Sequence, residues 1–108
     1  MSVEQADVVD GVGLDQDGYV EMLISDHLDW NDPRHIDLLA AKVEAYVGAV
    51  LSGQLVQSYP AAEGKPVRIN LVWQHVPSGD APRFFETAGQ QLSSVGIQFK
   101  QTALPEGF

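Results

Sequence analysis

The chain has 108 residues, of which 44% are hydrophobic and 19% are charged, a size and composition that predict a single folded domain and exclude wholesale disorder. Six Lys and Arg against fifteen Asp and Glu give a net charge of −9, which argues against binding to nucleic acid or to an anionic membrane surface. Neither a signal-peptide pattern nor a membrane-spanning apolar run occurs, so we expect a cytoplasmic protein.

The N-terminal part of the chain predicts a β-hairpin. Two runs rich in β-forming residues, Val8 to Leu14 and Tyr19 to Ser25, flank Asp15-Gln16-Asp17-Gly18. The Asp-Gly pair in this connection supplies the positive φ that a tight turn needs. The second run alternates, and its apolar side consists of Val20, Met22 and Ile24. We therefore expect a half-buried sheet.

Two amphipathic helices are predicted. The first begins at Asn31-Asp32-Pro33, where an Asx cap precedes a proline, and ends at Gly53. Its apolar residues recur at spacings of three and four: Ile36, Leu39, Val43, Tyr46, Val47, Val50 and Leu51. Its polar face is assigned to Asp37, Lys42 and Glu44. The second helix begins at Asp80 with Pro82 and stops at Gly96, and its apolar stripe consists of Phe85, Ala88, Leu92 and Val95.

Two further strands complete the predicted domain. In the segment from Val67 to Gln74, which ends before Pro77, the apolar residues at 67, 69, 71 and 73 alternate with Arg68, Asn70, Val72 and Gln74, and Ile97 to Gln101 follows the second helix. Ser58 to Pro66 is interpreted as a connecting loop. The order is β-β-α-β-α-β, and each strand has one covered face, so both helices pack on the same side. This predicts an α+β fold, a two-layer α/β sandwich with a four-stranded mixed sheet.

The sequence resembles a family of small acidic bacterial proteins that is known only as a domain of unknown function. The similarity extends over nearly the whole chain and rests on Val3-Glu4-Gln5 through Asp10-Gly11, Asp15 through Glu21, Ser25-Asp26-His27-Leu28-Asp29-Trp30, Ser52 through Leu55, Tyr59-Pro60 and Gly64-Lys65. The resemblance implies kinship and a bacterial setting. It implies no activity, cofactor or catalytic residue.

The negative charge is concentrated at the N-terminal end. Nine acids and no Lys or Arg lie between Met1 and Asp32, whereas six acids balance six bases from Pro33 onward. One interpretation is a solvated surface that confers solubility. The other is an acidic patch that meets a cation or a basic partner. Lys65 and Arg68 could also meet the acidic hairpin within the chain.

The densest polar segment predicts a candidate binding site between the second strand and the first helix. The candidate residues are Asp26, His27, Asp29, Trp30 and His35. A helix N-terminus beside carboxylates and imidazoles can hold a ligand. The competing interpretation assigns the aspartates and asparagine of this segment to caps and turns, and the tryptophan to a lid over the core.

Motifs for metals, cofactors and nucleophilic catalysis are absent from the sequence. The spacing of His27 and His35 matches no zinc pattern, and Asp15 to Gly18 begins like a calcium loop but lacks its later ligands. Gly11-Val12-Gly13 is not a dinucleotide fingerprint, no Gly-x-Ser-x-Gly occurs, and cysteine is absent. We therefore expect no metal and no cofactor.

Two functions follow as alternatives. The favoured one is a non-catalytic interaction module, for example immunity- or antitoxin-like, in which the acidic hairpin and the loop from Asp26 to Trp30 bind a basic protein. The other is a small hydrolase or metal-dependent enzyme centred on His27, His35 and nearby aspartates. The open sheet face and the strand edges further predict a weak homodimer.

Overall fold

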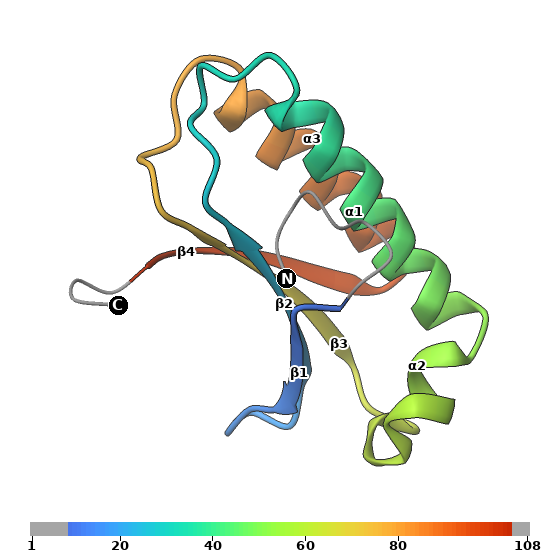
Figure 1. Ribbon diagram of the computed structural model, residues 1–108. Coiled ribbons are helices and arrows are strands. Elements are labelled where there is room, and N and C mark those ends of the chain that lie inside the picture. Colours follow the sequence, from blue (N-terminus) through green and yellow to red (C-terminus); the bar gives the residue numbers. More distant parts are fainter. Residues whose placement is uncertain (1–8, 105–108) are drawn as a thin grey trace.

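A four-stranded sheet with helices on one side forms the fold, seen in a computed structural model that describes residues 9–104 (Figure 1). The elements in chain order are β1 (Gly11–Leu14), β2 (Val20–Asp26), α1 (His35–Leu51), α2 (Gln54–Ser58), η1 (Pro60–Ala62), β3 (Val67–Trp73), α3 (Ala81–Ser94) and β4 (Ile97–Ala103). Among the described residues, no helix has the length and apolar character needed to cross a membrane.

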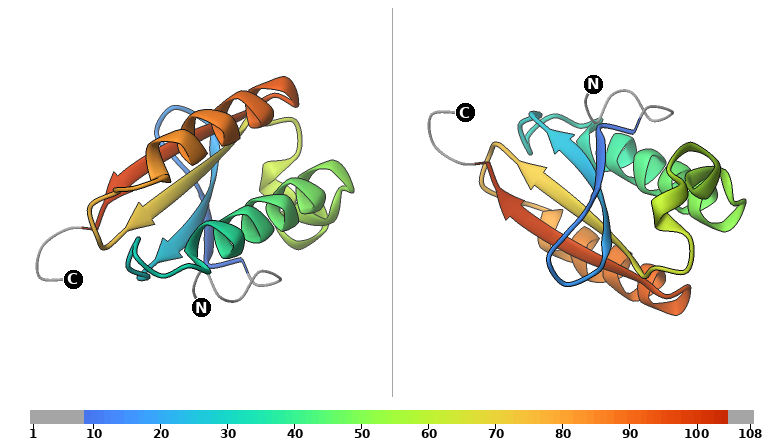
Figure 2. Two further views of the ribbon diagram at one scale, coloured as in Figure 1. Left: turned by 90° about the horizontal axis from the view of Figure 1, so that it is seen from above. Right: turned by 90° about the horizontal axis from the view of Figure 1, so that it is seen from below.

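The spatial order of the strands follows their order in the chain, β1-β2-β3-β4. β1 runs antiparallel to β2, whereas β2, β3 and β4 are mutually parallel. Viewed from below, the sheet lies in front of α1 and α3, so both long helices cover the same face (Figure 2). The predicted α+β class, the mixed sheet and the two-layer arrangement are confirmed. The additional short helices α2 and η1 lie within the segment between α1 and β3.

The hairpin closes with a three-residue loop. The amide of Asp15 donates to the carbonyl of Tyr19 at 2.9 Å, and the amide of Gly18 donates to the carbonyl of Asp15 at 3.2 Å. Gly18 has φ +84°, a left-handed value that favours glycine. The Asp15 carboxylate also accepts the amides of Asp17 and Tyr19 at 2.9 and 3.0 Å. The turn is therefore built from residues that the sequence singled out.

The core lies between the sheet and the two long helices. Val20, Met22 and Ile24 of β2 and Ile69 and Leu71 of β3 are all 0% exposed. From the helices, the core receives Leu39, Tyr46 and Leu92. Burial of each large apolar side chain stabilises the fold by about 1.5–3 kcal/mol. The apolar face created by the alternating strand pattern is therefore the face of the sheet that packs against the helices.

The helix ends differ from the predictions made from the sequence. α1 begins at His35, later than Asn31-Asp32-Pro33, because the Asp32 carboxylate binds the amide of Arg34 at 2.9 Å inside a preceding turn. Leu51 at the end of α1 is 63% exposed, and Val95 after α3 is 43% exposed. Both were wrongly assigned to apolar stripes, because each lies at the end of its helix, where the side chain is exposed and does not join the core.

Candidate functional site

Asp26 and His35 form a buried pair where β2 ends and α1 begins. The Nε2 atom of His35 lies 2.7 Å from each carboxylate oxygen of Asp26, and Nδ1 lies 3.1 Å from the carbonyl oxygen of Asp29. Both side chains are 0% exposed. Each ring nitrogen of His35 therefore faces an oxygen atom, so both polar atoms of the buried ring have a hydrogen-bond partner. The pair ties the end of β2 to the start of α1.

Trp30 covers this pair. Its ring stacks on His35 with centroids 3.9 Å apart, and it lies nearly perpendicular to the ring of Phe85 of α3 with centroids 5.6 Å apart. Its indole nitrogen donates to the carbonyl of His75 at 2.8 Å. The tryptophan therefore contacts two aromatic rings and has a partner for its polar atom, which is how a lid over a core behaves.

The loop brings together only part of the predicted site. Asp26, Trp30 and His35 form one cluster, whereas His27 and Asp29 are exposed. Asp29 also has a local role, because its carboxylate accepts the amide of Asn31 at 2.9 Å. A role of these five residues in binding a partner stays a prediction.

Replacement of Trp30 tests whether it acts as a lid. Trp30→Ala removes the ring that covers His35, so we expect a loss of about 3 kcal/mol in the free energy of unfolding, at the lower end for a large aromatic because the ring is only half-buried. Trp30→Phe retains a stacking ring but loses the donor to His75, and we expect a loss of about 1 kcal/mol. Urea unfolding measures both. Unchanged stability in Trp30→Ala would show that the side chain is a surface anchor.

A second buried polar cluster lies between the start of β1 and the middle of α1, and the sequence analysis missed it. The Lys42 ammonium, 0% exposed, lies 2.7 Å from a carboxylate oxygen of Asp10. The other oxygen of Asp10 accepts the amide of Ser25 at 2.7 Å. The hydroxyl of Tyr46 accepts the amide of Asp10 at 2.9 Å and donates to the carbonyl of Leu23 at 2.6 Å. Burial raises the pKa of Tyr46 well above its usual value.

A helical spacing could have revealed Lys42. The buried residues of α1 are His35, Leu39, Lys42 and Tyr46, at steps of four, three and four. These steps place all four on one face of a helix. Assigning every charged residue to the solvent side concealed this pattern, and the assignment of Lys42 to the polar face was wrong.

Arg68 of β3 neutralises part of the acidic hairpin on the open face of the sheet. Its guanidinium forms an ion pair with Asp15, lies 3.8 Å from Glu21 and lies over the ring of Tyr19 at 4.3 Å. Burial opposes ionisation of Asp15, but the amides of the turn and the charge of Arg68 outweigh it and hold the pKa of Asp15 below its usual value. The predicted contact between Arg68 and the hairpin is thus present.

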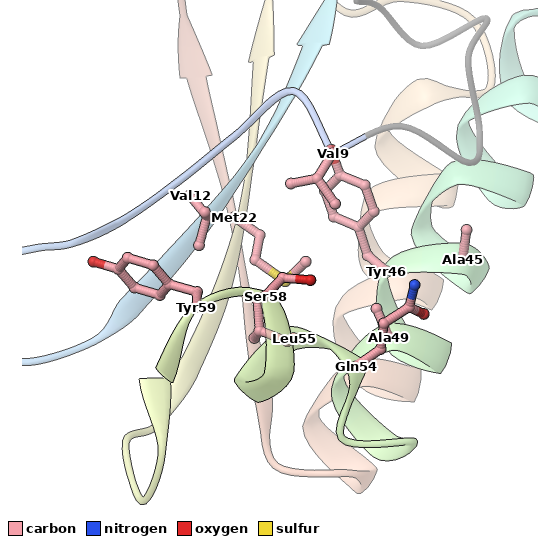
Figure 3. A pocket seen from close by; sticks show the side chains of 10 residues that line it. All are labelled: Val9, Val12, Met22, Ala45, Tyr46, Ala49, Gln54, Leu55, Ser58 and Tyr59. Atoms are coloured by element: carbon pink, nitrogen blue, oxygen red, sulfur yellow. The ribbon is translucent and has the colours of Figure 1, made fainter. Parts of the chain in front are cut away.

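A pocket opens between β1, the second half of α1 and α2. Its volume is about 330 Å³, and its walls are largely apolar (Figure 3). Val12 of β1 and Tyr59 lie at one side, Tyr46 of α1 lies at the other, and Met22 of β2 and Leu55 of α2 lie between them. The sequence did not indicate this pocket, because its walls come from segments far apart in the chain.

The comparisons with known proteins place the chain in a family. The family model that matches residues 1–105 is described as a family of unknown function, DUF6572. The chain belongs to DUF6572. No curated protein and no solved structure matches it. Membership in DUF6572 assigns no chemistry to any residue, so the function must be argued from the side chains.

The described part of this DUF6572 chain contains no group of three His, Asp or Glu side chains arranged to hold a metal ion. Asp26 and His35 come close enough, but their ligand atoms face one another. Asp32 is engaged as well: hydrogen bonds from the side chain and backbone of Arg34 hold the pKa of Asp32 below its usual value. In the structure, the segment from Asp26 to His35 joins β2 to α1.

Proposed function

We propose that the chain is a non-catalytic protein-interaction module whose acidic hairpin binds a basic partner protein. The observation that carries the proposal is the complete burial of Asp26 and His35, the pair that would have to be accessible in an enzyme. Asp26 and His35 are 0% exposed and bind one another. A general base must reach its substrate directly or through one water, so a pair sealed beneath Trp30 supports a structural role and weighs against the hydrolase alternative.

The hairpin retains negative charge that the fold does not neutralise. Asp15, Asp17 and Glu21 contribute three carboxylates, and Arg68 is the base that contacts two of them. Asp17 is exposed at the tip of the turn. Exposed charge of one sign accelerates encounter with a partner of the opposite sign. From Pro33 onward six acids balance six bases, so the negative excess is confined to the first third of the chain, which includes this hairpin.

The hairpin and the Asp26 to Trp30 loop lie at opposite ends of β2. The strand has seven residues, so the two regions are about 20 Å apart at ~3.3 Å per residue. A partner with a footprint of about 800 Å² spans such a distance. In this proposal the hairpin provides the main electrostatic contact, and exposed His27 and Asp29 provide a second contact at the far end.

A charge reversal at the hairpin tip tests the proposal. Cross-linking in the native host identifies a partner, which is then purified, and association rates are measured at low and physiological salt. Asp17→Lys should slow association by about tenfold at low salt and by less at physiological salt, because the attraction is screened over about 8 Å. Its matched control, Glu86→Lys on exposed α3, makes the same change in charge and should leave the rate unchanged.

The outcomes separate the two functions. Equal effects of Asp17→Lys and Glu86→Lys would mean that net charge alone matters and would contradict a hairpin site. Turnover of ester, phosphate or peptide substrates that disappears in Asp26→Asn while the fold persists would establish the enzyme alternative instead.

A further inference from the structure

β1 presents unpaired backbone groups at the edge of the sheet. The amide of Asp15 donates to the carbonyl of Tyr19, which makes these residues a hydrogen-bonded pair. In an antiparallel ladder, bonded and non-bonded pairs alternate. Gly13 and Gly11 are therefore bonded to β2, whereas the N–H and C=O groups of Val12 and Leu14 point away from it. β1 is the first strand of the sheet, so among the described residues no strand pairs with these groups.

The side chains of the same two residues project toward the pocket side of the sheet. Val12 pairs with Met22, and Leu14 pairs with Val20. Met22 and Val20 are buried under the helices, so Val12 and Leu14 share their side of the sheet. Val12 is 37% exposed and Leu14 is 46% exposed. The free edge and the apolar pocket are therefore continuous, and Figure 3 shows Val12 at the pocket wall opposite Tyr46.

We propose that an extended, basic segment of the partner adds to β1 as a fifth strand and inserts an apolar side chain into this pocket. The inference rests on the proposed function and deepens it. Strand addition uses the exposed backbone for affinity and pockets for alternate side chains for specificity. The outward N–H and C=O groups of Val12 and Leu14 supply the exposed backbone, and the pocket of about 330 Å³ supplies the site for a side chain.

Charge favours a basic segment over a second copy of the chain. The hairpin that continues from β1 carries three carboxylates against the guanidinium of Arg68. Each copy has a net charge of −9, so pairing two copies along β1 would bring like charges together. Lysine or arginine at the solvent-facing positions of an added strand would instead face the hairpin acids, with apolar residues directed into the pocket.

A designed peptide provides the probe. It is a labelled, end-capped peptide of ~7 residues that alternates lysine with valine or leucine, a length typical of one strand. Binding is measured by fluorescence anisotropy, and hydrogen exchange is followed at individual amides by NMR. We expect slowed exchange at the amides of Val12 and Leu14 when the peptide is bound, since these amides then acquire carbonyl partners. Unchanged exchange at both amides in the saturated complex would overturn the proposal.

Two variants separate the edge from the pocket. Val12→Pro removes an outward N–H that the fold does not use, and it should weaken peptide binding by about tenfold. Ala45→Trp, at an exposed wall residue, places an indole at the pocket and should weaken binding by a similar factor. If Val12→Pro does not fold, a peptide methylated at alternate backbone nitrogens tests the same bonds on the unaltered protein. Equal binding of methylated and unmethylated peptides would overturn strand addition.

Further results test the charge requirement, identify other occupants and separate the edge site from the proposed function. A peptide with glutamate in place of lysine should bind at least tenfold more weakly, and equal binding would overturn the requirement for positive charge. Peptide binding seen only after deletion of residues 2–8 would show that the chain itself occupies the pocket. Sedimentation that shows a dimer abolished by Val12→Pro would assign the edge to a second copy. If association with the native partner depends on Asp17 but not on Val12, the proposed function stands and the edge site fails.

Discussion

Leu71→Asp should unfold most of the protein at neutral pH. Leu71 is 0% exposed in the middle of β3 and belongs to the core beneath the helices. Its neighbours across the sheet are Ile24 of β2 and Gln101 of β4. Burial of a carboxylate in this apolar core costs several kcal/mol against a typical total stability of about 5–15 kcal/mol. Far-UV circular dichroism and urea unfolding measure the effect.

Val72→Asp is the matched control. Val72 is the next residue of β3, is only half-buried and faces the open side of the sheet beside Ser25 and Thr102. A carboxylate there stays in contact with water, so we expect a folded protein that has lost about 1 kcal/mol. Two variants with the same loss of stability would contradict the assignment of the two faces of β3.

Asp10→Ala should strongly destabilise the protein. It removes the carboxylate that lies 2.7 Å from the buried ammonium of Lys42 and accepts the amide of Ser25. Removing one partner of a buried ion pair costs about 3–5 kcal/mol, because the remaining charge stays desolvated. The midpoint of urea unfolding should fall accordingly, whereas the backbone amide at position 10, which donates to the hydroxyl of Tyr46, is retained in the variant.

Two controls define the cause of that loss. Lys42→Met in the Asp10→Ala background removes the buried charge and should restore at least half of the lost stability. Asp17→Ala removes an acid of the same region that is exposed, and it should change stability by less than about 0.5 kcal/mol. If Asp10→Ala and Asp17→Ala are equally mild, the ion pair with Lys42 does not stabilise the fold.

The acid-rich first third of the chain has a structural use that its composition alone conceals. Each of four acids pairs with a base or an imidazole located after residue 33: Asp10 with Lys42, Asp15 with Arg68, Asp26 with His35 and Asp32 with Arg34. The charge asymmetry along the sequence therefore helps the N-terminal segment to pack against the rest of the chain. The acidic surface left for a partner is smaller than the count of carboxylates suggests.

The sequence by itself determined the fold class and the faces of the strands. Alternation in β2 and β3, glycine at the hairpin turn and glycine after each long helix are local signals, since each depends on residues within a few positions of one another. The region of the candidate site was also predicted, because Asp26, Trp30 and His35 lie close together in the sequence. Their proximity in sequence led directly to their contact in space.

Only the tertiary structure decided which polar groups are buried. Lys42 and Asp10 are 32 positions apart, and Trp30 donates to a carbonyl 45 positions away. A lysine on a helix faces water unless another segment brings a carboxylate to it. The periodicity of the helix sequence does not show which segment that is. The same holds for the pocket beside β1, whose walls come from β1, β2, α1 and α2. Periodicity assigns a side chain to a face, but the chain segment that packs on that face determines its chemistry.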